Sequence, residues 1–181
     1  MADYKNIIGK PLKLVSTNLD NAQAEGQIWY NSTLGQFKDV IVRSAWASAA
    51  PVVSGRNQTA AAGTQDASIL FGGKEGPPPN ADTGTTQEYN GSGWAMGGTM
   101  TDARYELGGA GTQTAALAFG GQRQPGIVES NTQKYDGSSW TNTGALNSAR
   151  RFAFGFGIQT AAVAAGGTPP SPASSATEEF D

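Results

Sequence analysis

The sequence predicts an all-β protein made of short antiparallel strands in repeated units of 46–48 residues. Three observations support this prediction. A glycine-rich motif recurs at offsets of 48 and 46 residues, beginning at Gly63, Gly111 and Gly157. Within each unit, apolar residues form short runs or alternate with polar ones, as strands require. No stretch of the repeats shows the 3.6-residue period of an amphipathic helix.

Each repeat contains the same landmarks in the same order. The first motif ends in a double glycine, and a variable loop then leads to a polar strand that ends in an aromatic residue. A Trp follows five positions after each Tyr of this kind, and an Arg follows ten positions after each such Trp. The recurring residues are Gly72, Gly73, Gly120, Gly121, Gly166 and Gly167, then Tyr89, Tyr135 and Phe180, then Trp46, Trp94 and Trp140, and finally Arg56, Arg104 and Arg150.

These landmarks divide each unit into four short strands. Ala115–Phe119 is an apolar run before a double glycine, and residues 132–135 alternate ahead of Asp136-Gly137, a dipeptide that favours tight hairpins. The Trp strand follows directly, and residues 150–156 supply the fourth strand. We expect the Trp and Tyr positions to be equivalent and buried between neighbouring sheets. We expect the three arginines to brace neighbouring sheets by hydrogen bonds.

A unit of this length, with a double glycine, an aromatic residue and then a Trp, resembles the kelch motif. The resemblance covers about residues 44–181 and implies four-stranded β-propeller blades. We assign a partial copy to residues 44–62, units near 63–110 and 111–156, and a truncated unit to 157–181. Because six or seven blades need more chain than this, we expect an incomplete propeller. Either further chain or strand exchange between chains would complete it.

Residues 1–43 do not repeat, and we expect a separate segment with a small β-hairpin there. Its strands would lie near residues 27–31 and 36–42, with Gly35 supplying the positive φ of the loop.

The string Ala-Glu-Gly-Gln-Ile-Trp-Tyr-Asn-Ser-Thr at residues 24–33, closed by Gly-Gln-Phe-Lys at 35–38, resembles a segment near the start of phage tail-fibre and tail-tip proteins. Those of marine phages often carry kelch-like repeats behind it. The resemblance implies that this segment attaches to the virion, and the alternative is a plain hairpin that caps the repeats. The candidate attachment residues are Ile28, Trp29, Tyr30 and Phe37.

Composition excludes several classes of function. The chain has no cysteine and no histidine, which removes thiolate nucleophiles, the commonest general base and the commonest transition-metal ligands. A net charge of −3 and a pI of about 4.9 give no electrostatic footprint for nucleic acid. The N-terminus does not resemble a signal peptide, and no stretch is apolar enough for membrane insertion.

Acidic residues give no sign of a catalytic pair. Glycosidases need two carboxylates that converge in a pocket. The recurrent acidic position reads Glu88, Lys134 and Glu179, and its change of charge indicates a solvated face. We therefore expect no enzymatic activity, no cofactor and no bound metal.

The loop after each double glycine differs in sequence from repeat to repeat. These loops span residues 74–85, 122–131 and 168–176. Constant strands with divergent loops are typical of scaffolds that carry a binding surface, and the alternative is neutral surface. The candidate binding residues are Pro77, Pro78, Pro79, Arg123, Pro125, Pro169, Pro170 and Pro172.

These observations lead to one functional hypothesis. We expect a structural component of a phage tail fibre or tail tip, made in the host cytoplasm and incorporated in the virion. The expected partners are other virion tail proteins, further copies of the chain in a homo-oligomer such as a trimer, and a host-surface glycan or protein. The alternatives are a polysaccharide-degrading enzyme on the same scaffold and a kelch-type adaptor that binds another protein.

Overall fold

The structure of the protein is a computed structural model that describes residues 13–15, 28–39, 46–77, 80–169 and 172–181. The chain divides into two compact parts, an N-terminal part, Met1–Ser48, and a repeat part, Ala49–Asp181. The expected boundary after residue 43 lies outside the described residues. Every regular element described is a β-strand, so the described residues contain no helix that could cross a membrane.

The N-terminal part contains the expected hairpin. Its strands lie in the order β1-β2-β3, with β1 parallel to β2 and β3 antiparallel to it: β1 (Lys13–Val15), β2 (Ile28–Asn31) and β3 (Gln36–Asp39). The buried side chain of Asn31 accepts hydrogen bonds from the backbone N–H groups of Thr33 and Leu34, at 3.0 and 2.9 Å. Gly35 completes the turn with a φ of 65°, the left-handed conformation that glycine adopts without strain.

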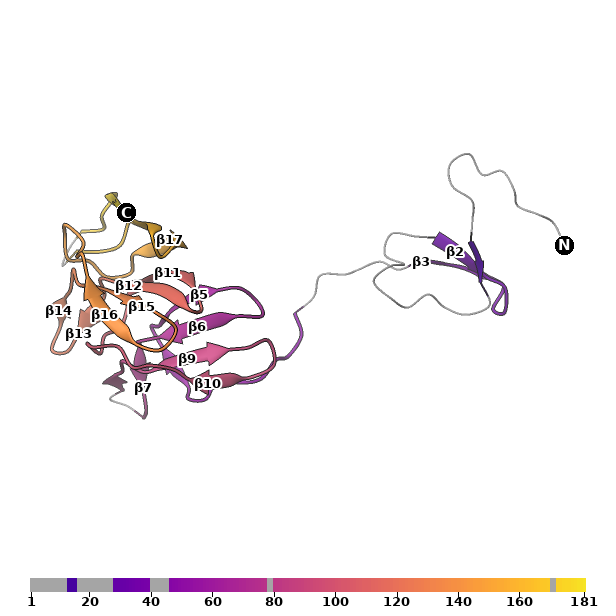
Figure 1. Ribbon diagram of the computed structural model, residues 1–181, viewed down its shortest axis with the longest axis horizontal. Helices are drawn as coiled ribbons and strands as arrows, with labels where there is room; N and C mark the ends of the chain where they lie inside the picture. Colours follow the sequence, from indigo (N-terminus) through magenta and orange to yellow (C-terminus); the bar gives the residue numbers. More distant parts are fainter. Residues whose placement is uncertain (1–12, 16–27, 40–45, 78–79, 170–171) are drawn as a thin grey trace. The chain divides into compact units, whose positions relative to one another are not determined.

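Three antiparallel sheets make up most of the repeat part (Figure 1). The first repeat sheet has the order β10-β9-β6-β5: β5 (Ala60–Gly63), β6 (Ser68–Phe71), β9 (Thr86–Tyr89) and β10 (Trp94–Met96). The second repeat sheet has the order β11-β12-β15-β16: β11 (Gly108–Thr112), β12 (Ala115–Phe119), β15 (Thr132–Tyr135) and β16 (Trp140–Thr143). The third repeat sheet has three strands: β17 (Phe154–Ile158), β18 (Ala161–Ala165) and β19 (Thr177–Phe180).

Two smaller sheets form in the segments between these strands. One joins three short strands in the order β4-β7-β8: β4 (Arg56–Asn57), β7 (Lys74–Glu75) and β8 (Ala81–Asp82). The other is a hairpin of β13 (Gln122–Arg123) and β14 (Ile127–Val128).

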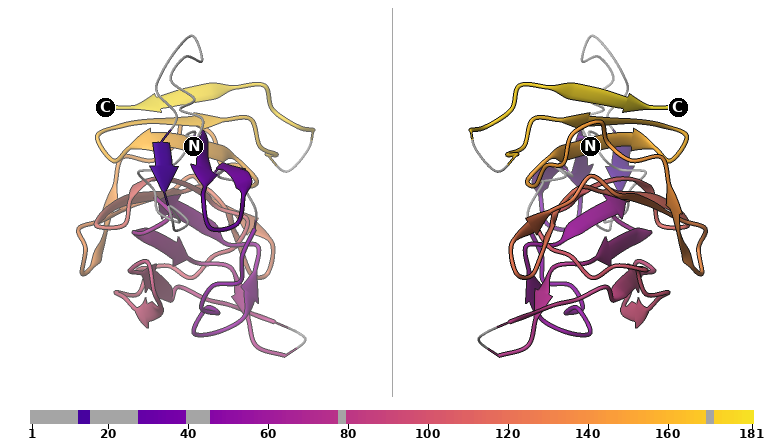
Figure 2. Two further views of the ribbon diagram at one scale, coloured as in Figure 1. Left: turned by 90° about the vertical axis from the view of Figure 1, so that its right-hand side faces the viewer. Right: turned by 90° about the vertical axis from the view of Figure 1, so that its left-hand side faces the viewer.

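The repeat sheets pack face to face in sequence order, from purple through orange to yellow in Figure 2. Strand β11 lies beside both β5 and β17. Strand β12 explains the apolar run that the sequence shows, because both of its faces are buried. Ala116 and Ala118 belong to the cluster that contains Phe71 of the first sheet, whereas Leu117 and Phe119 belong to the cluster shared with the third sheet. The alternation of side chains along one strand thus links three consecutive sheets.

The recurrent aromatic residues are not buried alike, so the expectation of equivalent burial was wrong. Trp140 is 4% exposed and packs against Phe71 and Tyr135, with ring centroids 4.9 Å away in both cases. Tyr89 and Trp94 form the same kind of pair, 5.1 Å apart, but are only half-buried. Their face of the first sheet points away from the second sheet, and within the described residues no sheet packs on it. Trp46 is fully exposed.

The strand expected at residues 150–156 begins later, at Phe154. Phe152 has a φ of 57° and cannot continue a strand. Gln58 and Glu106, at the equivalent positions, have φ values of 56° and 57°. The N–H of Glu106 donates to the carbonyl of Gln58, and the N–H of Phe152 donates to that of Glu106, at 2.9 and 2.7 Å. Hydrogen bonds between the backbones of the segments that lead into successive sheets, here called crossovers, therefore maintain a conformation that these residue types disfavour.

The double glycines are required where a crossover passes close to the end of the second strand. A Cβ at Gly73 would lie 2.5 Å from the carbonyl oxygen of Asn57, and one at Gly121 would lie 2.8 Å from that of Tyr105. Both glycines also have positive φ, at 98° and 97°. Any larger residue would have to push the crossover away.

The packing predicts a large difference between two apolar substitutions. Trp140→Ala should lower the free energy of unfolding by about 3–5 kcal/mol, because it leaves a cavity beside Phe71. Ile127→Ala, at an exposed position of β14, should change it by less than ~0.5 kcal/mol. Urea denaturation followed by circular dichroism measures both. Equal effects of the two substitutions would contradict the assignment of Trp140 to the core.

Candidate functional site

A buried arginine precedes each repeat sheet, and the second and third of these arginines also connect that sheet to the preceding one. The guanidinium of Arg104 donates from Nη1 to the carbonyls of Gly120 and Asn131 in the second sheet, at 3.0 and 2.6 Å. The carbonyl of Arg104 accepts a hydrogen bond from the N–H of Gly73 in the first sheet, at 2.8 Å. One residue thus ties the two sheets together, and its side chain is fully buried.

The other two arginines make the same contacts. Arg56 donates to the carbonyls of Gly72 and Thr85, at 3.3 and 2.8 Å. Arg150 donates to the carbonyls of Gly166 and Ala176, at 3.2 and 3.1 Å. In each repeat the acceptors are the first glycine of the pair and the residue just before the polar strand. The arginines therefore bond to the protein's own backbone and do not face a ligand site.

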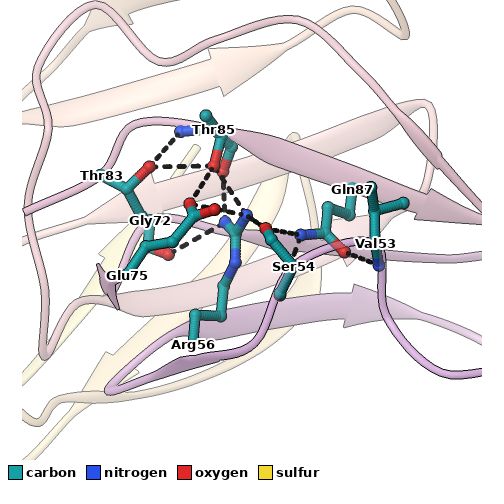
Figure 3. A network of polar contacts seen from close by, with 8 residues as sticks. All are labelled: Val53, Ser54, Arg56, Gly72, Glu75, Thr83, Thr85 and Gln87. Carbon is teal, nitrogen blue, oxygen red and sulfur yellow. Dashed lines mark hydrogen bonds and ion pairs between the residues drawn. The ribbon is translucent and has the colours of Figure 1, made fainter. Parts of the chain in front are cut away.

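Around Arg56 the brace extends into a polar network (Figure 3). Nη2 donates to the hydroxyls of Ser54 and Thr85, at 3.0 and 2.7 Å, and pairs with Glu75 at 3.3 Å. Hydrogen bonds, the first from Ser54, lower the pKa of Glu75. The amide of Gln87 also donates to the Ser54 hydroxyl, at 2.8 Å. Both terminal nitrogens of the Arg56 guanidinium, the Ser54 and Thr85 hydroxyls and the Glu75 carboxylate thus bond to one another, and shared hydrogen bonds of this kind stabilise a buried polar network.

Arg104 has the driest surroundings of the three arginines. Burial lowers the pKa of Arg104 to about 10, and nearby acidic residues, Asp102 first, act against this shift. At neutral pH the side chain still carries its charge, and its hydrogen bonds go to backbone carbonyls. A cation hydrogen-bonded in this way makes stronger contacts than a neutral donor would.

The glutamines of the second and third Gly-Thr/Ile-Gln motifs form a second link between sheets. The amide of Gln113 donates to the carbonyls of Ser68 and Tyr89 in the first sheet, at 3.2 and 2.6 Å. Gln159 does the same one repeat later, reaching the carbonyls of Ala116 and Tyr135 at 3.0 and 2.5 Å. This side chain recurs in the sequence, but its role becomes visible only when neighbouring sheets are seen together.

Glu88 does not lie on a solvated face, which corrects the expectation for this position. The Tyr135 hydroxyl donates to its Oε1 at 2.5 Å and accepts a hydrogen bond from the N–H of Gly98 at 3.3 Å. Burial, followed by the hydrogen bond to Glu88, raises the pKa of Tyr135 to about 12. This contact is a third link between the first and second sheets.

Several acidic residues of the repeats pair with arginines. Glu106 pairs with Arg151 at 2.9 Å, and Glu178 pairs with Arg150 at 2.5 Å. In the described part of the chain, no three acidic residues gather as a metal site would require. These contacts are structural in character, since Arg150 also bonds to two backbone carbonyls of the third sheet's repeat and Arg151 also bonds to the side chain of Gln122.

The loops after the double glycines lie close together. The backbone N–H of Gln124, in the loop of the second repeat, donates to Oδ2 of Asp82 in the loop of the first, at 2.7 Å. Lys74 lies over the ring of Tyr105, 4.1 Å from its centroid. The loops of the first and second repeats, which differ in sequence, thus lie side by side.

The candidate loop residues lie mainly on the surface. Pro77, Arg123, Pro125 and Pro172 are exposed, and Pro169 is half-buried. Arg123 forms an ion pair with Glu129 at 2.5 Å. Pro78, Pro79 and Pro170 lie outside the described residues.

The candidate attachment residues lie on the hairpin β2–β3. Ile28 and Phe37 are 64% and 62% exposed, and Tyr30 packs edge-on against Phe37 with ring centroids 5.2 Å apart. The side chain of Trp29 is outside the described part of the structure. The hairpin therefore presents apolar side chains to solvent, which is typical of an interaction surface.

Comparison with known proteins gives the fold and no function. No family model and no curated protein matches the sequence. The chain is similar to the solved structure of YjhT, a kelch-type β-propeller, with a TM-score of 0.56 and 13% sequence identity. The similarity covers 83% of this chain and 47% of the YjhT chain, so the chain spans about half the length of YjhT. At this identity the likeness shows the fold alone.

Removal of the brace should destabilise the repeat part. Arg104→Met leaves the buried carbonyls of Gly120 and Asn131 without their donor and should cost about 2–5 kcal/mol. Arg123→Met removes an exposed ion pair and should cost less than about 1 kcal/mol. Thermal and urea unfolding of the two variants would show the difference. A loss below that of Arg123→Met would mean that Arg104 is not a structural brace.

Tyr135 should ionise late in an alkaline titration. Its folded pKa of about 12 lies above the ordinary value of 10.0, so the neutral form is favoured by folding. The associated stability is complete below pH ~10 and is lost as the pH rises toward 12. Absorbance at the tyrosinate band should show a late step that Tyr135→Phe removes and Tyr30→Phe retains. A titration unchanged by Tyr135→Phe would contradict the contact with Glu88.

Proposed function

We propose that the chain is a non-enzymatic structural component of a bacteriophage tail appendage, in which kelch-like propeller blades present loops for contact with the host surface. The observation that carries this proposal is that recurrent residues and variable loops have different roles within each repeat. The recurrent Arg, Gln, Trp and Gly residues contact other parts of the repeats. The loops differ from repeat to repeat, and those of the first and second repeats contact each other. Such a design supports recognition by a surface and offers no catalytic device.

The strand order supports the blade assignment. Each complete repeat sheet is a four-stranded antiparallel meander, and the first strand of each sheet lies beside the first strand of the next. Blades of a propeller have this arrangement around a central axis. Within the described residues the three sheets do not close into a ring, so the proposal is an arc of blades.

The N-terminal hairpin supports the attachment role. It forms a compact part separate from the repeats and exposes Ile28 and Phe37. Burial of two such side chains would contribute a few kcal/mol, on the order of 1.5–3 kcal/mol each, to an interface with another tail protein.

Particles of the phage that encodes the chain test this attachment. Antibodies against the repeat part should label the tail, and the label should be lost when the chain carries Ile28→Asp and Phe37→Asp. Ile127→Asp, an equally polar change in the repeat part, should leave the label in place. Absence of the wild-type chain from purified particles would overturn the virion assignment.

Binding and cleavage are separated by one experiment. The purified chain, incubated with polysaccharide from the host envelope, should be retained on it while the polymer keeps its length. Arg123→Ala should weaken retention if the loops form the contact surface, whereas Lys134→Ala, which removes the same charge from a strand, should not. Shortening of the polysaccharide would favour the depolymerase alternative. Retention that is insensitive to the loop would place the contact surface elsewhere.

A further inference from the structure

Within the described residues, the third repeat sheet has three strands where the other two have four. The first and second sheets end in β10 and β16, which begin with Trp94 and Trp140 and pair with the polar strand. The third sheet stops at β19, whose outer edge has no strand partner within the described residues.

A pocket marks the place where the missing Trp would lie. Trp140 occupies its site by packing on Phe71 and Tyr135 and by donating from Nε1 to the Thr86 hydroxyl, at 3.0 Å. One repeat later the equivalents of these three partners line a pocket between the second and third sheets: Phe119, Phe180 and Thr132. The pocket therefore has the same three contacts available, two aromatic rings and one hydroxyl.

Trp46 occupies the same position in the repeat as Trp94 and Trp140, and its side chain is exposed in the single chain. It lies 48 residues before Trp94, the same offset that separates the first two repeat motifs, and it is 104% exposed. Residues 46–49 form no strand in the single chain. Transfer of the register Tyr135↔Trp140 and Thr132↔Thr143 to the third sheet pairs Phe180 with Trp46 and Thr177 with Ala49.

The two ends of the arc also expose complementary faces. The third sheet presents Phe154, Phe156 and Ile158, which are 76%, 56% and 56% exposed. These residues are on the face opposite to Ala162 and Ala164, which pack on the second sheet. The first sheet presents the half-buried Tyr89–Trp94 pair on its outer face. Both faces are equivalents of surfaces that are buried between the sheets in the interior of the arc.

One position shows the complementarity residue by residue. Glu88 in the first sheet accepts a hydrogen bond from Tyr135 in the second. In the next pair of sheets the equivalents are Lys134 and Phe180, so the acceptor and the hydroxyl are both absent. At the open end the position is Glu179, an acceptor again, and the equivalent of Tyr135 in a following first sheet is Tyr89. The residues match if the third sheet is followed by the first sheet of another copy.

Gln65 supports the same arrangement. Its equivalents Gln113 and Gln159 donate to two backbone carbonyls of the preceding sheet, whereas the exposed Gln65 makes no such contact within the described residues. By the same offsets its acceptors in a preceding third sheet would be the carbonyls of Ala162 and Phe180.

We propose that two copies of the chain close head to tail into one six-bladed ring, each donating its Trp46 strand to the third sheet of the other. Both junctions of such a ring are identical, so the assembly has twofold symmetry. Since one chain corresponds to 47% of the YjhT chain, two copies span about the length of one complete propeller of that type. The inference rests on the repeats and not on the virion role, and it favours a dimer over a trimer.

Sedimentation of the recombinant chain tests the stoichiometry. The wild-type chain should sediment at twice its mass of 18.6 kDa. Trp46→Ala combined with Gln65→Ala should raise the dissociation constant at least tenfold, because both side chains are exposed in the described part of the single chain and would be buried in the dimer. Ile127→Ala, at an exposed position of the β13–β14 hairpin in the second repeat, should leave the dimer unchanged. A monomer, a trimer or an open polymer in place of the dimer would overturn the proposal, as would a dimer insensitive to the double substitution.

A cysteine pair tests the strand exchange itself, because the natural chain has no cysteine. The transferred register places Ala47 opposite Glu179, at the short Cβ distance of directly paired residues. A mixture of the Ala47→Cys and Glu179→Cys chains should form a disulfide-linked dimer on mild oxidation. Each variant alone should form far less. Equal cross-linking of the mixture and the single variants would refute the exchange, whatever the result for phage particles.

Discussion

The buried guanidinium that bonds to two carbonyls determines much of the repeat architecture. Each arginine lies 16 residues before the first glycine whose carbonyl it binds, in all three repeats. Its second acceptor lies 29, 27 or 26 residues away, on the far side of the variable loop. The arginine thus fixes the distance from its own segment to the double glycine. It also holds the two ends of the variable loop together, because its two acceptors lie on either side of that loop. Loop length and sequence can then vary without changing the core, which is why divergent loops coexist with constant strands.

The sequence was sufficient for features that depend on local pattern. The strands Ala115–Phe119 and Thr132–Tyr135 and the hairpin turn at Gly35 follow from apolar runs, alternation and turn residues, and the structure has them with those bounds. The left-handed conformation of Phe152 did not follow, because it is maintained by a hydrogen bond to Glu106 in another crossover. Likewise, Glu88 resembled a solvated residue until its partner, Tyr135, was placed beside it.

The different burial of the three Trp residues has one physical cause. In a repeat array each unit contacts only its neighbours, so an identical residue is buried or exposed according to whether a neighbour exists. Trp140 has the first sheet beside it and is buried, whereas Trp94, in the first repeat sheet that the structure describes, is half-buried. The local sequence around each Trp carries no information about how exposed its side chain is. The exposure depends on whether another repeat sheet packs against the Trp.

The same reasoning applies to the ends of the arc. An array that ends in solvent needs terminal repeats with polar outer faces, since exposed apolar sheet faces promote association. Here the outer face of the third sheet carries Phe154, Phe156 and Ile158. At roughly 25 cal/mol per Å² of apolar area, leaving such side chains in water forgoes several kcal/mol that the interior sheets gain. The ends therefore have the chemistry of interior interfaces. Glu88 and Tyr135 bond across the first interface, whereas Lys134 and Phe180 occupy these positions at the second. Glu179 at one end and Tyr89 at the other restore the first combination, which specifies that these two ends fit each other.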